Sequence, residues 1–117
     1  MFDISPNGIV IVNRGDTFSI DVFVNIGTLL FPIQYVLNED DKVYFALMEP
    51  NQPFEHALIR KVFTKDNLDE GNNVVMDFKP EDTEFLLPGL YYYQVKLVRS
   101  TGEVDTIIQK TKFIIND

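Results

Sequence analysis

The stretch LYYYQVKLVR at residues 90–99, followed by STGE at 100–103 and VDTIIQKTKFII at 104–115, decides the fold. Four aromatic or apolar side chains occupy alternate positions of its first part: Tyr91, Tyr93, Val95 and Leu97. A period of two is typical of a β-strand with one face in a core. The polar segment at 100–103 contains a glycine and predicts a hairpin turn. We therefore predict two long strands joined as a hairpin.

Similar segments precede this hairpin, separated by turn residues at intervals of about 8–15 residues, as in β-sandwiches. The alternation predicts further strands at residues 9–12, 17–24, 42–48, 56–64 and 74–78, with a short edge strand at 34–37. Proline followed by acidic residues predicts one short helical turn near residues 80–86. Since no segment fits a βαβ unit, we expect an all-β, antiparallel sandwich of about seven strands in a meander-like order, forming a single domain over residues 1–117.

The composition narrows the class of protein. The 117 residues contain no cysteine and carry a formal net charge of −8, with 45% hydrophobic residues. The absence of cysteine favours folding in a reducing cytoplasm. A strongly acidic chain is repelled by phosphate backbones, which argues against nucleic-acid binding. The N-terminus lacks a basic region before its apolar residues, and no apolar run reaches the ~18 residues of a membrane span, so we expect no signal peptide and no membrane association.

The segment from the fifth predicted strand onward resembles a passage of immunoglobulin-like (Ig-like) domains. The residues that carry the resemblance are Val75 and Phe78, the run Glu81-Asp82-Thr83, and Pro88-Gly89 followed by Tyr91 and Tyr93. In that family an acidic corner precedes a strand that begins with a buried tyrosine. The disulfide cysteines and core tryptophan of antibody domains are missing, so the resemblance implies a non-antibody variant of the Ig-like sandwich.

Three segments resemble the Ig-like domains of tailed-bacteriophage virion proteins, in particular the N-terminal domain of baseplate upper proteins. They are RGDTF at 14–18, VYFAL at 43–47 and PGLYYYQV at 88–95, and the similarity extends over residues 9–115. In that family the domain is an attachment module on the virion. The present chain lacks the coiled-coil extension and receptor-binding head of those proteins. The resemblance implies a stand-alone decoration or adaptor protein, or a single domain of a larger protein.

The sequence contains few combinations of residues that could form a catalytic site. A Ser-His-Asp set would combine the single histidine, His56, with one of three serines, Ser5, Ser19 or Ser100, and none of these has a nucleophile-elbow context. An exposed histidine at a strand start is the favoured reading of His56. A carboxylate pair such as Glu81 with Glu84 is the remaining enzymatic possibility. We expect no enzyme activity, no cofactor and no metal site.

Two acidic loops and one RGD sequence are candidate ligand sites. Residues 38–41 and 66–70 have carboxylates for calcium but lack the ligand spacing and glycine of a calcium loop, so solvated turns are favoured. Integrin binding by Arg14-Gly15-Asp16 is disfavoured. A tight turn in which Gly15 has positive φ explains this segment better.

Apolar residues exceed the needs of the core at two places. Leu29, Leu30 and Phe31 either tuck against the edge of the sandwich, which we expect, or form an exposed patch that seals against a partner. If Tyr91 and Tyr93 point inward, alternation places Tyr92 outward beside Gln94 and Lys96. Exposed tyrosine anchors protein interfaces and also stacks on sugars. Our interface candidates are Leu29, Leu30, Phe31, Tyr35, Tyr92 and Gln94.

These observations predict a non-catalytic bacteriophage structural or adaptor protein. It would attach to other virion proteins, as a head decoration or in the tail or baseplate, after assembly in the host cytoplasm. Other copies of the same chain are a further candidate partner, in a homo-oligomer. The alternative is a carbohydrate-binding module that uses Tyr92.

Overall fold

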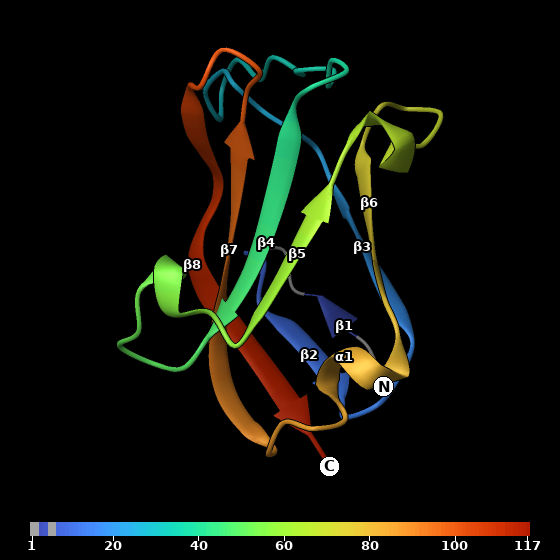
Figure 1. Cartoon of the computed structure of the whole chain (residues 1–117), viewed down its shortest axis with the longest axis vertical. Coiled ribbons are helices and arrows are strands. Elements are labelled where there is room, and N and C mark those ends of the chain that lie inside the picture. The colour runs from blue at the N-terminus through green and yellow to red at the C-terminus, as the bar shows by residue number, and fades with distance from the viewer. Residues whose placement is uncertain (1–2, 5–6) are drawn as a thin grey trace.

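The computed structural model describes residues 3–4 and 7–117 (Figure 1). Within these residues the chain forms eight strands, one short α-helix and two 3₁₀ turns. The elements in chain order are β1 (Asp3–Ile4), β2 (Val10–Asn13), β3 (Phe18–Val22), β4 (Lys42–Met48), η1 (Phe54–His56), β5 (Ile59–Phe63), η2 (Lys65–Asn67), β6 (Val74–Phe78), α1 (Pro80–Thr83), β7 (Gly89–Val98) and β8 (Val104–Asn116). The all-β prediction is confirmed.

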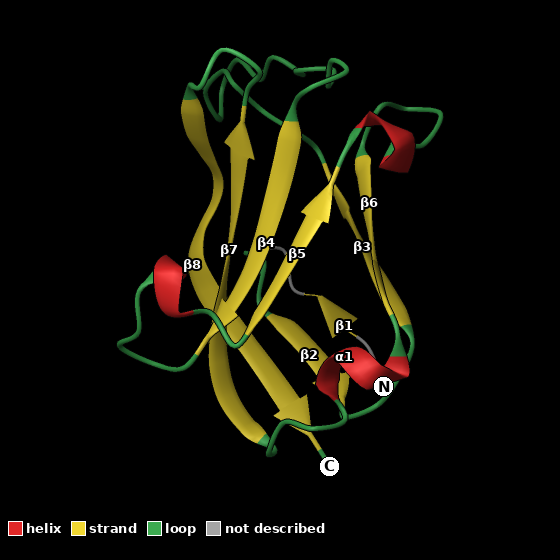
Figure 2. Ribbon diagram, in the orientation of Figure 1, coloured by secondary structure: helices red, strands yellow, loops and turns green. Residues whose placement is uncertain are grey.

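The strands form two sheets, and strands dominate the molecule (Figure 2). One sheet has six strands in the order β1-β2-β8-β7-β4-β5, and the other pairs β3 with β6. The predicted meander is wrong, because strands distant in sequence are neighbours in both sheets. Purely antiparallel pairing is also wrong, because β2 runs parallel to β8, with Val10 opposite Phe113. Alternation gives the face of each side chain but not the partner of each strand.

Aromatic side chains from both sheets meet in one core. The rings of Phe18 and Phe78, on the two-stranded sheet, stack with centroids 4.6 Å apart. Phe45 of β4 meets Phe78 edge to face at 4.9 Å, and Phe113 of β8 lies 6.2 Å from Phe18. All four side chains are buried. The two sheets are therefore joined by aromatic packing, which is worth more than its buried area alone.

The tyrosines of β7 alternate as predicted. Tyr91 and Tyr93 are buried against the core, whereas Tyr92 faces outward and is half-buried. The Tyr91 hydroxyl donates a hydrogen bond of 2.6 Å to the carbonyl oxygen of Leu87, and the Tyr93 hydroxyl donates one to that of Gly8. Burial raises the pKa of Tyr93 to about 12. Both hydroxyls thus find the partners that buried polar groups require.

The short helical turn and the RGD segment meet at one end of the sheets. The predicted turn is present as α1, and the buried hydroxyl of Thr83 accepts a 2.9 Å hydrogen bond from the amide of Gly15. Gly15 has a φ of +79°, as expected for a tight turn, and Arg14 pairs with Asp117 at 2.7 Å. The turn and its contacts give Arg14 and Gly15 structural roles.

The remaining differences between the predicted and the observed elements concern edge strands and loops. The predicted strand at 56–64 is shorter, since η1 occupies Phe54–His56 and β5 begins at Ile59. The predicted edge strand at 34–37 is wrong: this segment contributes an isolated bridge between Gln34 and Asn25 instead. The two-residue strand β1 was not predicted, because so short a segment has no readable period.

Candidate protein-interaction site

The segment at residues 25–34, between β3 and β4, folds back on itself as a small hairpin outside the main sheets. The amide of Ile26 donates a hydrogen bond of 2.9 Å to the carbonyl oxygen of Ile33. The amide of Thr28 donates one of 3.1 Å to that of Phe31. The two arms are therefore held together by their own backbones and do not depend on pairing with a core strand.

Polar side chains reinforce this hairpin. The Oδ1 atom of Asn25 accepts hydrogen bonds from the amides of Gly27, at 2.8 Å, and Ile33, at 3.0 Å, so one side chain joins the two arms. The hydroxyl of Thr28 accepts a 3.0 Å hydrogen bond from the amide of Phe31 across the turn. Such bonds order a loop before any partner arrives, and this lowers the entropic cost of binding.

Three consecutive apolar side chains project from the turn: Leu29, Leu30 and Phe31, which we call the hairpin tip. Their exposed fractions are 97%, 85% and 77%. Our expectation that they tuck against the edge of the sandwich is wrong. The core positions before and after the hairpin are filled by Val24 and Leu37, both buried. The intervening residues pair with one another and extend into solvent.

A buried carboxylate ties the end of this loop to the turn between β7 and β8. Asp41 accepts three hydrogen bonds: from the Tyr35 hydroxyl at 2.6 Å, from the amide of Asn38 at 2.7 Å and from the amide of Ser100 at 2.8 Å. The guanidinium carbon of Arg99 lies 4.8 Å from the centre of the Tyr35 ring. The interface candidate Tyr35 is thus partly buried and holds the loop in place.

Burial and hydrogen bonding act in opposite directions on Asp41. Burial alone would raise the pKa of this carboxyl, but the hydrogen bonds from Tyr35, Asn38 and Ser100 outweigh it and lower the pKa. The hydrogen bond between Tyr35 and Asp41 also raises the pKa of Tyr35, since its hydroxyl donates to a carboxylate. Hydrogen bonds to a carboxylate favour its charged form. Asp41 is therefore an ionised structural group.

The second acidic loop uses its carboxylate in the same manner. Oδ1 of Asp69 accepts hydrogen bonds of 2.9 Å from the amides of Gly71 and Asn73. In both acidic loops, then, a carboxylate closes a turn through backbone amides. In the part of the chain that the structure describes, no group of three or more metal-ligating side chains could hold a metal ion.

The other interface candidates lie elsewhere. Tyr92 and Gln94 are half-buried on the outer face of the six-stranded sheet, and the ammonium group of Lys110 lies 5.8 Å from the centre of the Tyr92 ring. Tyr92 pairs with Met48, the last residue of β4, whereas the hairpin precedes Lys42, its first. The hairpin tip therefore lies outside the sheets, before the start of β4, whereas Tyr92 lies on the sheet beside the end of β4.

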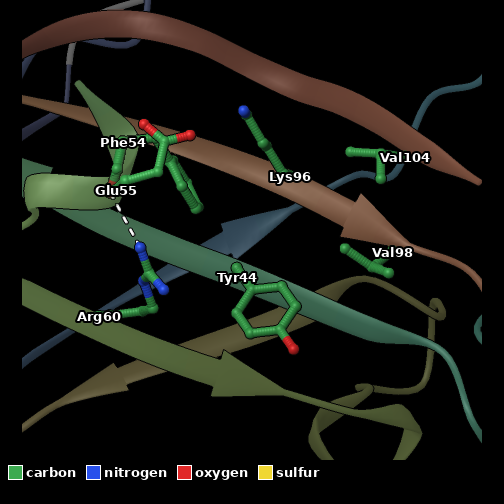
Figure 3. A pocket seen from close by; sticks show the side chains of 7 residues that line it. All are labelled: Tyr44, Phe54, Glu55, Arg60, Lys96, Val98 and Val104. Carbon is green, nitrogen blue, oxygen red and sulfur yellow. Dashed lines mark hydrogen bonds between the residues drawn. The ribbon is translucent and has the colours of Figure 1, made fainter. Parts of the chain in front are cut away.

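A pocket that sequence analysis did not identify opens on the same outer face (Figure 3). Its volume is about 360 Å³, and seven residues line it: Tyr44, Phe54, Glu55, Arg60, Lys96, Val98 and Val104. The alternation of β4 and β7 places Tyr44, Lys96 and Val98 on this face. Only the three-dimensional path of the loop at 49–58 brings Phe54 beside them.

The candidate catalytic groups are exposed where the structure describes them. Ser19 lies on β3 and Ser100 in the turn between β7 and β8, whereas Ser5 lies outside the described residues. His56 is exposed, in η1 and not at a strand start, with Nδ1 3.4 Å from Oε1 of Gln52. Glu81 and Glu84 are exposed near α1. Among the described residues, no helix has both the length and the apolar character needed to cross a bilayer.

Comparisons with known proteins give no relative for this chain. No protein-family model matches it, and no curated protein or solved structure matches it either. The hairpin tip and the outer-face pocket must therefore be interpreted from their own chemistry.

Proposed function

We propose that the protein is a non-catalytic attachment module that binds another protein through the hairpin tip. The observation that carries this proposal is the near-complete exposure of Leu29, Leu30 and Phe31 on a hydrogen-bonded turn. Contiguous exposed apolar side chains mark interaction surfaces, since each loses unfavourable contact with water when a partner covers it. An ordered turn presents them at lower entropic cost than a flexible one.

We place this attachment in a bacteriophage virion, as a head decoration or as a tail or baseplate adaptor. This part of the proposal rests on the resemblance of residues 14–18, 43–47 and 88–95 to virion Ig-like domains. The hydrogen bond from the hydroxyl of Tyr91 to Leu87 supports the Ig-like element of that resemblance. In Ig-like domains a tyrosine near the start of the corresponding strand makes such a bond to the backbone a few residues upstream.

The experiment compares two sets of substitutions at exposed apolar residues. The test variant replaces Leu29, Leu30 and Phe31 with serine. The matched control replaces Phe85 and Leu87, which are 64% and 75% exposed, with serine. The tagged proteins are produced in host cells during infection by the bacteriophage. The virus particles are then collected by gradient sedimentation.

We expect the wild-type and control proteins to sediment with particles and the test variant to remain soluble, folded and unattached. Wild-type sedimentation of the test variant would refute attachment through the hairpin tip. Recovery of the wild-type protein only as a free species would refute the virion setting.

The carbohydrate-binding alternative depends on Tyr92, whose ring is half-buried and lies near Lys110. No contact described above favours it over protein attachment. A glycan array comparing the wild-type protein with Tyr92→Ala tests it directly. A glycan bound by the wild-type protein and lost in the variant would support this alternative.

A further inference from the structure

The outer-face pocket combines two cations with an apolar lining. Arg60 of β5 and Lys96 of β7 both approach Phe54: the guanidinium carbon lies 5.0 Å and the ammonium nitrogen 4.5 Å from the ring centre. Tyr44 lies on β4, the strand between β5 and β7 (Figure 3). Cations near an aromatic ring are stabilised by its quadrupole, so Phe54 helps to hold both charged groups at the pocket.

Both cations retain unused hydrogen-bond donors. Arg60 has five N–H donors, and the structure records one of its hydrogen bonds, from Nη2 to the carbonyl oxygen of Phe54 at 3.0 Å. Lys96 has three donors and no recorded acceptor among the described residues. Neither cation belongs to the ion pairs found within residues 3–4 and 7–117. Glu55 also lines the pocket, but its negative charge is outweighed by the positive charges of Arg60 and Lys96. The charged residues of the lining therefore carry a net positive charge.

The surrounding surface has the same sign, although the protein as a whole is acidic. The outer face of the six-stranded sheet carries half of the chain's ten Lys and Arg residues: Lys42, Arg60, Lys96, Lys110 and Lys112. The exposed face of the two-stranded sheet instead carries Asp21 and Asp77. This segregation favours the approach of an anion to the pocket side of the molecule.

The rest of the lining is apolar or aromatic. Val98 and Val104 face each other across β7 and β8, and the ring of Tyr44 completes this side. The volume of about 360 Å³ falls within the range of small-ligand sites, roughly 300–1,000 Å³. The pocket therefore offers donors for a negative group and an apolar surface for the moiety that bears it.

We propose that this pocket binds a carboxylate attached to an aromatic or aliphatic group. The planar fork of Arg60 matches the two oxygens of a carboxylate, and Lys96 supplies a second charge-assisted bond. The valines and Tyr44 cover the apolar moiety. The carboxylate comes either from a free organic acid or from the C-terminus of a partner polypeptide, and the two sources present the same chemistry to these residues. This site is separate from the hairpin tip and does not depend on it.

Ligand titrations followed by NMR of backbone amides test the proposal. The probes are phenylacetate, its uncharged analogue phenylacetamide, the peptide Ala-Ala-Phe as free acid and as amide, and inorganic phosphate. We expect saturable shifts for amides around Lys96, Val98 and Val104 with an acid probe. Shifts with phenylacetate assign the site to small acids, and shifts with the peptide acid alone assign it to a polypeptide terminus. Absence of shifts with both acids, or equal affinity for the amides or for phosphate, would overturn the proposal.

Three variants then connect binding to the cations. Lys96→Gln and Arg60→Gln each remove one charge, and Lys65→Gln removes the same charge from an exposed residue of η2 outside the pocket. Loss of one charge-assisted bond should weaken binding by about tenfold. Lys96→Gln is the more informative of the two variants, because no side-chain hydrogen bond of the described structure involves Lys96 and the substitution should leave the fold intact. Equal weakening in Lys65→Gln would show a general charge effect and would overturn the site.

Discussion

The side chain of Lys61 reaches from β5 toward the two-stranded sheet and places Nζ 2.7 Å from Oδ2 of Asp82. The same ammonium group donates a 2.7 Å hydrogen bond to the carbonyl oxygen of Asp77 and lies 4.7 Å from the centre of the Phe78 ring. In register Lys61 stands opposite the buried Phe45, so it belongs to the core-facing side of an edge strand. One lysine thus connects β5, β6 and α1 where the open edges of the sheets meet.

Replacing Lys61 with methionine should lower the free energy of unfolding by about 2 kcal/mol, because Asp82 then keeps its charge in a partly buried place without its cation. Urea unfolding at neutral pH measures the change. Lys65→Met is the control, since Lys65 is exposed and lies in η2. An equal loss in both variants would contradict a specific role for Lys61.

Acid should weaken the fold through Asp82. Burial opposes its ionisation, but the hydrogen bonds from Lys61 and the amide of Lys79, with the charges of both lysines, lower the pKa of Asp82 in the folded protein. A lowered folded-state pKa gives stability that is complete above the unfolded-state value of about 3.9 and is lost as the pH falls through the folded-state value. Unfolding free energies from pH 6 to pH 2 should fall less steeply for Asp82→Asn than for the wild type. Parallel curves would contradict this assignment.

The Tyr91 hydroxyl provides a test with a control on the adjacent residue. Tyr91→Phe removes the hydrogen bond to Leu87 and should lower the free energy of unfolding by about 1 kcal/mol. Tyr92→Phe removes a hydroxyl from the outward face of the same strand and should change it by less than about 0.5 kcal/mol. Thermal unfolding of both variants measures the difference. Equal effects would show that the Tyr91 hydrogen bond adds nothing to stability.

Substitution of Asp41 should destabilise the fold more than its place in a polar loop suggests. In Asp41→Asn an amide donor replaces an acceptor oxygen and faces an N–H or O–H group, so we expect a loss of about 2 kcal/mol. Tyr35→Phe removes one of the three hydrogen bonds and should cost about 1 kcal/mol. Because the two side chains share a bond, the double variant should lose less than the sum of the single losses. An additive result would show that they do not interact.

Features that depend on neighbouring residues are predicted accurately from the sequence, whereas features that depend on contacts between distant residues are not. The strands at residues 42–48 and 74–78 were predicted with their observed bounds, because alternate positions in each are apolar. The parallel pairing of β2 with β8 joins segments about a hundred residues apart and leaves no local signal. The order of strands in a sheet is set by such distant contacts.

The candidate sites likewise combine features that the sequence shows with features that depend on the three-dimensional structure. Leu29, Leu30 and Phe31 were recognised as an apolar excess, but their exposure depends on the bonds made by Asn25 and Thr28 within the hairpin. An apolar triplet alone does not distinguish a buried turn from a projecting one. The pocket was missed because its lining comes from four strands and one loop, and no local pattern relates Phe54 to Lys96.

Gly27 provides a way to disturb the hairpin while leaving Leu29, Leu30 and Phe31 unchanged. A Cβ atom at this position would overlap the carbonyl oxygen of Phe31 and lie 2.8 Å from the amide nitrogen of Ile33. Gly27→Ala should therefore open the hairpin, and the Ile33 amide should exchange its hydrogen faster with solvent. Because the hairpin lies outside both sheets, the melting temperature should change little.

The same variant separates an ordered apolar turn from apolar composition alone. If ordering of the hairpin contributes to attachment, Gly27→Ala should weaken sedimentation with particles although all three apolar side chains remain. Gly71→Ala is the control, because a Cβ atom there meets its neighbours at the ordinary distance of 3.5 Å in another exposed turn. If Gly27→Ala opens the hairpin and still attaches as the wild type does, the apolar residues bind without a preformed turn. In that case the hydrogen bonds of Asn25 and Thr28 serve only to keep an exposed loop in order.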